Sequence, residues 1–248
     1  MAQTMPKVRL FVEADLGPDA AVPVSADQAN YLFNVMRLGV GAEVALFNGR
    51  DGEWRAEITA AAKRSGALAC RERLRPQSGS PDLDLLFAPL KKARTDFVAE
   101  KATEMGVRRL RPVFTRFTNS ERVRTDRLRA HAVEAAEQCG ILTVPEVTEP
   151  QPLGATLDAW DETRRLLFCD ESLEAAPAAA VLAAEAPGPW AILIGPEGGF
   201  APEEQTRLRS LPYARPVTLG PRILRAEAAA VAALALAQAS LGDWRSQS

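Results

Sequence analysis

The first 75 residues alternate short apolar stretches with polar turns, a pattern that predicts a small β-rich domain. The segment Asn48-Gly49-Arg50-Asp51-Gly52 separates two of these stretches and is typical of a hairpin turn. One helix is expected at about Asp27–Leu38. Strands are expected at Arg9–Val12, Ala21–Val24, Glu43–Phe47, Glu53–Ile58 and Ala67–Arg73. Residues 1–75 are therefore predicted to form a small β-barrel domain.

From Leu83 onwards, short apolar strands alternate with longer helices, which is the pattern of an α/β domain with a parallel sheet. The preceding segment, Leu74–Pro81, is rich in proline and serine and is expected to be a linker, so the second domain should span residues 82–248. Strands are expected at Leu83–Ala88, Leu110–Phe114, Arg165–Cys169, Trp190–Ile194 and Pro216–Leu219. Helices are expected at about Thr95–Met105, Asp126–Cys139, Ala176–Glu185, Pro202–Ser210 and Ala226–Leu241.

The last of these helices contains the longest uncharged apolar run, Ala228–Leu241, which is shorter than the roughly 18 residues that a membrane span needs. It is expected to be a core helix. Three scattered cysteines and a single histidine, His131, provide no ligand spacing for a metal, so no metal site is expected. Unpaired thiols and the lack of a secretory leader favour a reducing cytoplasm.

The charge distribution indicates a nucleic-acid partner that the net charge of −2 conceals. Lys91–Arg129 holds 12 Lys and Arg against 5 Asp and Glu, whereas Ala130–Trp190 holds 2 against 11. Of the 30 cations 25 are arginine, whose planar guanidinium pairs with phosphate. A GC-rich genome would explain the arginine content equally well. The basic block still predicts a local RNA-binding face, with the acidic stretch turned away from it.

The chemistry is expected in two glycine-proline loops, because parallel sheets bind ligands at the carboxyl ends of their strands. The first loop, Gly195-Pro196-Glu197-Gly198-Gly199, follows an apolar strand, and the second, Gly220-Pro221-Arg222-Ile223-Leu224, follows another. Neither loop matches a dinucleotide or triphosphate motif. Either loop alone could be a tight turn, but together they favour a site where backbone groups bind a flat heterocycle.

The paired loops and the residues around them resemble one known family. Leu193–Gly199 and Leu219–Glu227 resemble the C-terminal motifs of the RsmE family, the 16S rRNA (uracil-N3)-methyltransferases of the SPOUT superfamily. Upstream, Lys101–Val107 and Glu137–Gly140 resemble the same family, as does Val35-Met36-Arg37 with Phe47-Asn48-Gly49 in the first domain. The match covers nearly the whole chain.

The resemblance implies a PUA-like RNA-binding barrel followed by an α/β domain with a trefoil knot. It also implies a homodimer that uses S-adenosyl-L-methionine (SAM) to methylate N3 of a uridine in 16S rRNA of the small ribosomal subunit. The family's threonine after the second loop is replaced here by Ala228, so no hydroxyl role is carried over. The residues implied to bind the cofactor are Ile194, Gly195, Pro196, Glu197, Gly198, Gly199, Leu219, Gly220, Ile223 and Leu224.

Methylation at N3 requires loss of the N3 proton, so a base or a cation is expected near the reacting methyl group. Arg225 is the leading candidate for stabilising the negative charge on O2 or O4. Glu227 could accept the proton or only orient Arg225. Glu197 is an equal candidate for the base, and its position between Pro196 and Gly198 suits a loop-fixing hydrogen bond equally well. RNA contacts are expected from Arg9, Arg37, Lys91, Lys92, Arg94, Arg116, Arg122 and Arg124.

Two alternatives remain open from the sequence. A related SPOUT enzyme could modify another rRNA or tRNA site with the same loops. A non-catalytic RNA-binding module would keep the barrel and the basic block but would not need both glycine-proline loops, which are intact here.

Overall fold

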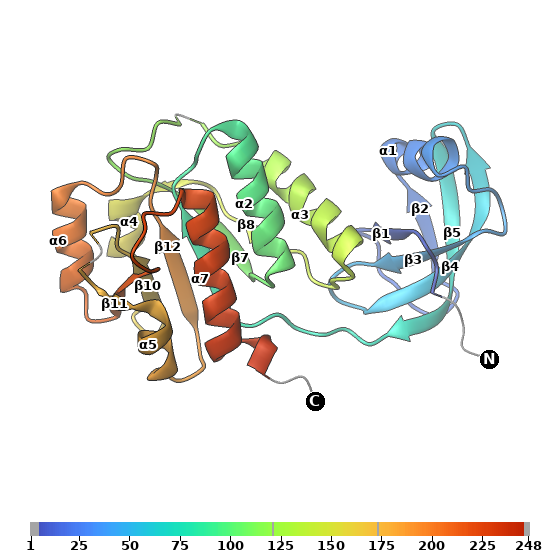
Figure 1. The fold of residues 1–248 in the computed structure, drawn as a ribbon. Helices are drawn as coiled ribbons and strands as arrows, with labels where there is room; N and C mark the ends of the chain where they lie inside the picture. The colour runs from blue at the N-terminus through green and yellow to red at the C-terminus, as the bar shows by residue number, and fades with distance from the viewer. Residues whose placement is uncertain (1–4, 121, 173, 246–248) are drawn as a thin grey trace. The chain divides into compact units, whose positions relative to one another are not determined.

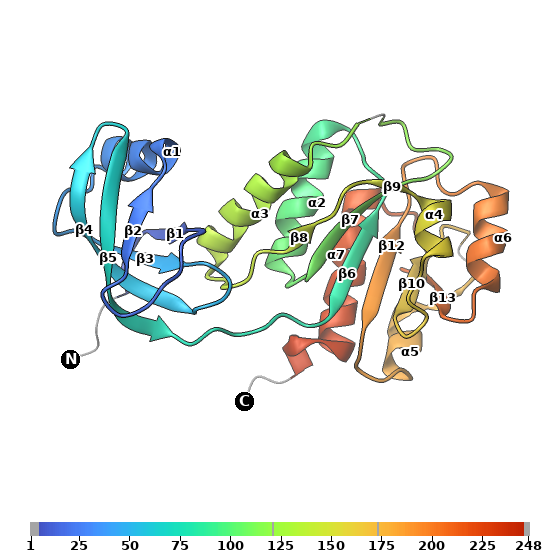
Figure 2. The ribbon, with the colours of Figure 1, turned by 180° about the vertical axis from the view of Figure 1, so that it is seen from behind.

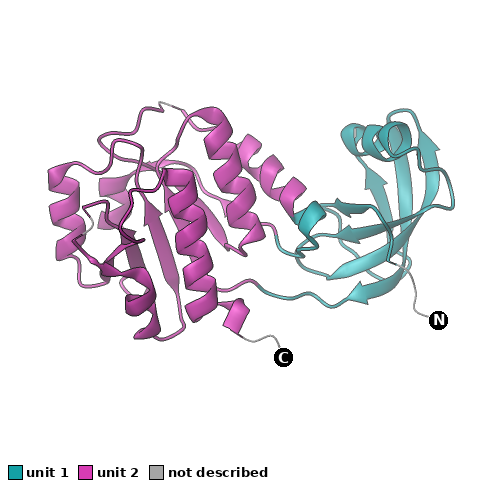
Figure 3. Ribbon diagram, in the orientation of Figure 1, with its two compact units in different colours: residues 1–79, 136–143 teal, residues 80–135, 144–248 magenta. Residues whose placement is uncertain are grey.

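The computed structural model describes residues 5–120, 122–172 and 174–245, which divide into two compact units (Figure 3). Unit 1 comprises residues 1–79 and 136–143, and unit 2 comprises residues 80–135 and 144–248. Most of each unit is one continuous stretch of chain. Residues 136–143 are the exception, because they cluster with unit 1 although unit 2 residues flank them on both sides.

Unit 1 is built on a five-stranded sheet with the order β1-β3-β4-β5-β2 (Figure 1). The pair β1 and β3 is parallel, and the other pairs are antiparallel. All five strands predicted from the sequence are present, and the predicted hairpin joins β3 to β4, with Phe47 opposite Glu53. The strands are β1 (Arg9–Phe11), β2 (Ala21–Val24), β3 (Glu43–Phe47), β4 (Glu53–Ala62) and β5 (Ser65–Arg75).

The helix expected at Asp27–Leu38 is shorter and irregular. A capping box between Ser25 and Gln28 starts α1 (Ala26–Ala29), which continues as a π-helical segment, Asn30–Val35. The chain then leaves the helical conformation at Arg37, which has a φ of 55°. A left-handed residue cannot continue a right-handed helix, so the element ends before Leu38.

Residues Ala136–Thr143 are held in unit 1 by two arginines. The guanidinium of Arg9 donates hydrogen bonds to three main-chain carbonyls of this segment, and Arg75 donates to a fourth at 2.9 Å. Both arginines also pair with the fully buried carboxylate of Glu53, at 2.6 and 2.7 Å. The side chain of Arg9 is only 12% exposed. Arg9 is therefore a structural group, which corrects the sequence-based expectation that it contacts RNA.

Unit 2 is an α/β unit with a parallel sheet in the order β11-β13-β10-β12-β6-β7-β8, and β9 pairs with β7 (Figures 1 and 2). The strands are β6 (Leu83–Phe87), β7 (Arg109–Phe114), β8 (Glu146–Val147), β9 (Gln151–Pro152), β10 (Arg165–Cys169), β11 (Ala176–Pro177), β12 (Trp190–Ile194) and β13 (Ala214–Thr218). The helices are α2 (Lys92–Glu104), α3 (Thr125–Cys139), α4 (Leu153–Asp158), α5 (Ala178–Ala183), α6 (Pro202–Ser210), α7 (Ala226–Leu241) and the 3₁₀ turn η2 (Asp243–Arg245).

The central strands are buried along their whole length and, apart from Asp84 in β6, are apolar, because helices cover both faces of the sheet. Every residue of β6 and β12 is buried. Side chains on one face pack with α2, α5 and α7, and those on the other face pack with α4 and α6. In α7 the buried alanines Ala226, Ala230, Ala233 and Ala237 follow the helical repeat, so this helix lies close to the sheet and to α2 as the expected core helix.

Several elements of unit 2 differ from the sequence prediction. The helix expected at Ala176–Glu185 begins later, because Ala176–Pro177 pairs with β13 as a short strand before α5 starts. The helix α4 was not predicted, since it has six residues, follows Pro152 and includes Gly154. The two-residue strands β8 and β9 were also not predicted, because they are too short to produce an alternating pattern.

Candidate active site

In the loop after β12, the backbone at Gly195 packs against the ring of Phe200. Phe200 is 3% exposed and packs edge-on against Phe168 at 5.1 Å. A Cβ atom at Gly195 would lie 2.6 Å from the Phe200 ring, so only glycine allows this approach. The main-chain N–H of Gly199 donates to the carbonyl of Pro196 at 3.0 Å. The sequence Gly-Pro-Glu-Gly-Gly thus forms a tight turn against the core at the carboxyl edge of the sheet.

Glu171 lies just after β10 and holds this loop in place by hydrogen bonds. Glu171 was not predicted from the sequence as a site residue. Its Oε1 accepts hydrogen bonds from the main-chain N–H of Phe200 at 3.0 Å and from the side-chain amide of Gln205 at 2.9 Å. The available sequence signal was its position, two residues beyond an apolar strand of a parallel sheet. The carboxylate fixes the far end of the first glycine-proline loop.

The loop after β13 exposes apolar side chains. Gly220 has a φ of 118°, and its main-chain N–H and carbonyl both lie within hydrogen-bond distance of the Thr218 hydroxyl, at 3.4 and 3.1 Å. Ile223 is 78% exposed and Leu224 is 37% exposed, which is unusual for side chains of this size. These side chains are therefore available to a ligand or another surface.

Both loops line one cavity of about 410 Å³. A smaller cavity of about 60 Å³ adjoins it, and Leu219 lies in that lining. Gly220 is in neither lining, and Cys169, Ala226 and Ala229 are lining residues that the sequence did not single out. The predicted cofactor residues in the larger lining are Ile194, Gly195, Pro196, Glu197, Gly198, Gly199, Ile223 and Leu224.

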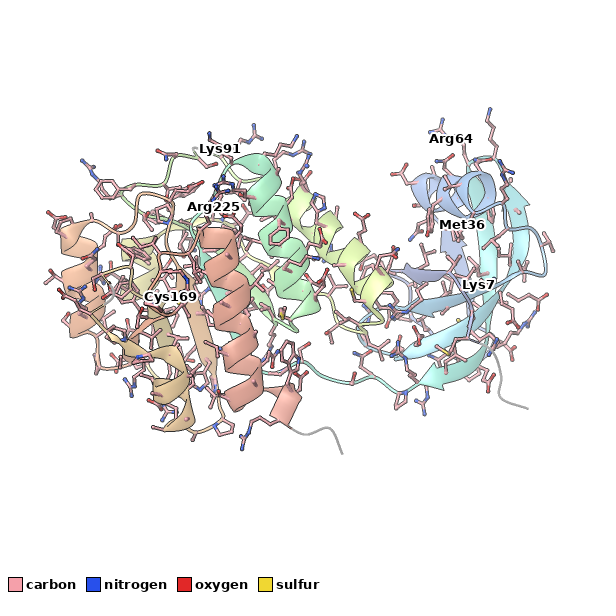
Figure 4. All side chains as sticks on the ribbon, viewed as in Figure 1. Lys7, Met36, Arg64, Lys91, Cys169 and Arg225 are labelled. Atoms are coloured by element: carbon pink, nitrogen blue, oxygen red, sulfur yellow. The ribbon has the colours of Figure 1, made fainter. Side chains whose placement is uncertain are left out.

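Cys169, the last residue of β10, lines this cavity (Figure 4). Burial raises the pKa of its thiol to about 12. The thiol is therefore protonated at neutral pH and contributes a small, uncharged wall rather than a nucleophile.

The guanidinium of Arg225 is a cation at the cavity wall. Arg225 lines the cavity at the residue before α7, and its side chain is exposed (Figure 4). Within the described part of the chain it has no side-chain hydrogen bond or ion pair. A guanidinium without an internal partner can bind an anionic or carbonyl oxygen of a substrate.

Of the two candidate carboxylates, Glu197 and Glu227, only the first lines the cavity, and Arg94 forms an ion pair with each. Glu197 lines the cavity, whereas Glu227 is not among its lining residues. Arg94 Nη1 lies 3.2 Å from Glu197 Oε1, and Arg94 Nε lies 3.5 Å from Glu227 Oε1. Arg94 was expected from the sequence to contact RNA, and the structure instead places it in these two ion pairs.

The other predicted RNA-binding residues are exposed. Arg37 follows the π-helical segment of unit 1 next to Met36, which is itself 40% exposed (Figure 4). In unit 2, Arg124 is exposed but paired with Asp126 at 2.6 Å. The remaining predicted RNA-binding residues of unit 2 are also exposed; they are Lys91, Lys92, Arg116 and Arg122.

Two features are absent from residues 5–120, 122–172 and 174–245. No three or more His, Cys, Asp and Glu side chains there are grouped so that they could hold a metal ion. No helix in this part of the chain has both the length and the hydrophobicity needed to cross a bilayer.

Comparisons with known proteins agree with this architecture. Residues 77–238 match the family described as RNA methyltransferase domain, and residues 24–68 match the RNA methyltransferase PUA domain. The Ribosomal RNA small subunit methyltransferase E of Synechocystis is 30% identical over 239 residues, which cover 94% of this chain and 78% of the relative. The protein of that name from Rickettsia conorii is 28% identical over 229 residues, which cover 92% of this chain and 93% of the relative.

Solved structures give the same result. Ribosomal RNA small subunit methyltransferase E from Neisseria gonorrhoeae, bound to S-adenosyl methionine, matches with a TM-score of 0.85 and 25% identity, covering 97% of this chain and all of its own. A methyltransferase from Legionella pneumophila with bound SAM matches with a TM-score of 0.84 and 27% identity, and the match covers 95% of this chain and 98% of that protein. The chain therefore belongs to the RNA methyltransferase family, and within it to the ribosomal RNA small subunit methyltransferase E proteins.

Proposed function

We propose that the protein transfers a methyl group from SAM to N3 of a uridine in 16S rRNA. One observation carries this proposal: both glycine-proline loops line a single cavity that has the unpaired guanidinium of Arg225 at its wall. Such a site combines a ligand cradle with a cation for a developing anion. Family membership supports the same reaction.

The cavity suits SAM in size and chemistry. Its volume of about 410 Å³ lies in the usual range for small-molecule sites. The glycines leave main-chain groups accessible to a flat base, and Ile194, Ile223 and Leu224 supply apolar walls. Glu171 and Glu197 also line the cavity, and carboxylates complement a ligand that carries a sulfonium and an ammonium group. When bound, SAM supplies an electrophilic methyl group.

The chain's own residues would prepare the uridine. N3 carries a proton at neutral pH and becomes nucleophilic only as that proton leaves. Arg225 would bind O2 or O4 as negative charge develops there. Glu197 is the better placed of the two carboxylates to accept the proton, because it lines the cavity and Glu227 does not.

RNA would be held by the exposed cations near the site. Lys91 and Lys92 start α2, and Arg116, Arg122 and Arg124 lie in the segment after β7. In a parallel sheet both segments follow strand carboxyl ends, at the edge that carries the two loops. Arg37 would add a contact from residues 1–75, the proposed PUA-like RNA-binding domain, while residues 82–248 form the proposed methyltransferase domain.

Three further properties belong to the proposal. The segment containing both loops would form the trefoil knot that the family resemblance implies, and the packing of α7 on α2 and α5 after strand β13 is consistent with such a path. The protein would act as a homodimer, which sedimentation analysis can test. An rRNA substrate would place the reaction in the cytoplasm.

The decisive experiment is nucleoside analysis after reaction. The purified chain is incubated with SAM and either free 16S rRNA or assembled small subunits, and the digested RNA is examined by mass spectrometry. We expect N3-methyluridine. Methylation at a different atom or only in tRNA would favour a related enzyme, and calorimetry that detects no SAM binding would favour a non-catalytic module.

A further inference from the structure

Arg94 joins three segments that are far apart in the sequence. It lies in the first turn of α2, Glu197 lies in the loop after β12, and Glu227 lies in the first turn of α7. The guanidinium is within 3.2 Å of one carboxylate and 3.5 Å of the other. Figures 1 and 4 show that α2 and α7 begin at the same end of unit 2, where Lys91 and Arg225 are labelled.

The two carboxylates in this cluster depend on Arg94 to different degrees. Glu197 is 34% exposed and lines the cavity. Glu227 is 18% exposed, and its Oε2 is buried without a hydrogen-bond partner. Among the described residues, Arg94 is the one ion-pair partner of Glu227. A carboxylate in such surroundings is costly without a cation, so Glu227 holds Arg94 in place.

This arrangement is poorly suited to binding an RNA phosphate. A guanidinium between two carboxylates has no excess positive charge to offer, and a phosphate approaching it would meet Glu197 and Glu227 as well. The side chain of Arg94 is also only 35% exposed, whereas its neighbours Lys91 and Lys92 are exposed and unpaired within the described residues. The contacts are those of an internal support.

We propose that Arg94 is a positioning residue that anchors Glu197 at the cavity wall by linking it to Glu227. The proposal rests on the proposed function, because the orientation of Glu197 matters only if this carboxylate takes part in methyl transfer. Glu227 then acts through Arg94 and is not the proton acceptor. Without Arg94, the Glu197 carboxylate would rotate freely and lose its alignment with the substrate.

The test separates the rate of methyl transfer from RNA affinity. Single-turnover rates at saturating SAM and RNA are measured for Arg94→Ala, Arg94→Lys, Glu227→Gln and the double variant Arg94→Ala with Glu227→Gln. We expect Arg94→Ala to slow transfer about 10²-fold. Arg94→Lys should recover part of the rate, because it keeps the charge but not the planar geometry. The double variant should be about as slow as Arg94→Ala alone, since both changes break one linkage.

A matched control comes from α6. Arg207 pairs with Asp158 and is 39% exposed, close to the value for Arg94, but it lies outside the cavity lining. Arg207→Ala should leave the transfer rate within about twofold, as surface ion pairs contribute little. RNA dissociation constants and their salt dependence should be unchanged in Arg94→Ala, whereas Lys92→Ala should weaken RNA binding.

The outcomes distinguish the two proposals. If the wild-type chain transfers no methyl group to 16S rRNA, the proposed function is overturned and the role of Arg94 with it. If the wild-type chain is active and Arg94→Ala keeps its rate but loses RNA affinity, the proposed function stands and the positioning role is overturned. If Arg94→Ala does not fold, Arg94→Lys and Glu227→Gln decide the matter: unchanged rates in both would overturn the positioning role.

Discussion

The carboxylate of Glu171 fills the space where a side chain at Gly199 would begin. A Cβ atom at residue 199 would lie 2.4 Å from Glu171 Oε1, and Gly199 has a φ of 69°. The same oxygen accepts the main-chain N–H of Phe200. Glu171 can therefore reach the N–H of Phe200 only if residue 199 is glycine, and this arrangement sets the shape of the first loop.

Gly199→Ala should weaken SAM binding by about tenfold or more. The left-handed conformation costs a non-glycine residue about 1 to 2 kcal/mol, and the added methyl group would also push Glu171 away. Isothermal titration calorimetry measures the change. Gly188→Ala is the control, because that glycine has no atom within 4 Å of the added Cβ. Equal affinity in both variants would contradict the assigned role of the loop.

Glu171→Ala should also weaken SAM binding, and Glu171→Gln should do so much less. Alanine leaves the N–H of Phe200 and the amide of Gln205 without their acceptor, whereas glutamine can keep a carbonyl oxygen at the same place. We expect a loss of about tenfold for alanine, measured by the same titration. Equal losses for the two variants would show that the charge of Glu171 matters and its hydrogen bonds do not.

Arg225→Ala should abolish methyl transfer while SAM binding remains. Removal of a group that stabilises developing charge typically lowers the rate about 10²- to 10³-fold. Transfer of a radiolabelled methyl group to 16S rRNA gives the rate, and calorimetry gives the affinity. Arg108→Ala is the control, because Arg108 lies just before β7, at the amino edge of the sheet. Full activity in Arg225→Ala would exclude Arg225 from catalysis.

Charge reversal at Arg122 and Arg124 should weaken rRNA binding and reduce its salt dependence. Each phosphate contact contributes a slope of roughly 0.7 to 0.9 in a plot of log affinity against log salt. The double variant Arg122→Glu with Arg124→Glu should lower the slope by about 1.4 to 1.8, the sum for two contacts. Filter binding over a salt series measures it, with Arg108→Glu as a control at the amino edge of the unit 2 sheet. An unchanged slope would remove both arginines from the RNA surface.

Glu53→Gln should destabilise the protein and remove part of its sensitivity to acid. Burial raises the pKa of Glu53, but hydrogen bonds from Arg75 and Arg9 outweigh it, so the net pKa is below its usual value of 4.5. The ion pairs therefore stabilise the fold above pH 4.5, and this stabilisation is lost as the pH falls through the lowered pKa. Breaking a buried pair costs about 3 kcal/mol.

Thermal unfolding of wild type and Glu53→Gln between pH 3 and pH 7 checks this prediction. The difference in stability between the two proteins should be largest at neutral pH and shrink in acid. A constant difference across the range would mean that the charge of Glu53 does not contribute.

The central strands of the sheet could be predicted from the sequence because each is a short and mostly apolar run. Trp190–Ile194 is found at the expected residues, and the loop that follows it lines the cavity as expected. The buried charge of Asp84, in a neighbouring strand, is tolerated because Arg109 pairs with it at 2.8 Å. Local patterns of this kind are visible in the chain itself.

The contacts that complete the site could not be predicted in the same way. Arg94 and Glu197 are 103 residues apart, and nothing in the spacing of either residue indicates that they meet. Glu171 looks like any other acidic residue after a strand until the position of Phe200 is known. The basic composition around Arg94 favoured RNA binding, since composition does not show which cations already have internal partners.

The participation of residues 136–143 in unit 1 has a consequence for biosynthesis. Arg9 and Arg75 leave the ribosome early, but the carbonyl groups they bind are made only after β6, α2, β7 and most of α3. Unit 1 therefore cannot form the hydrogen bonds from Arg9 and Arg75 until residues 136–143 have been synthesised. Its maturation overlaps in time with the emergence of the second sheet, so a messenger truncated at codon 80 would encode an incomplete unit rather than an independent domain.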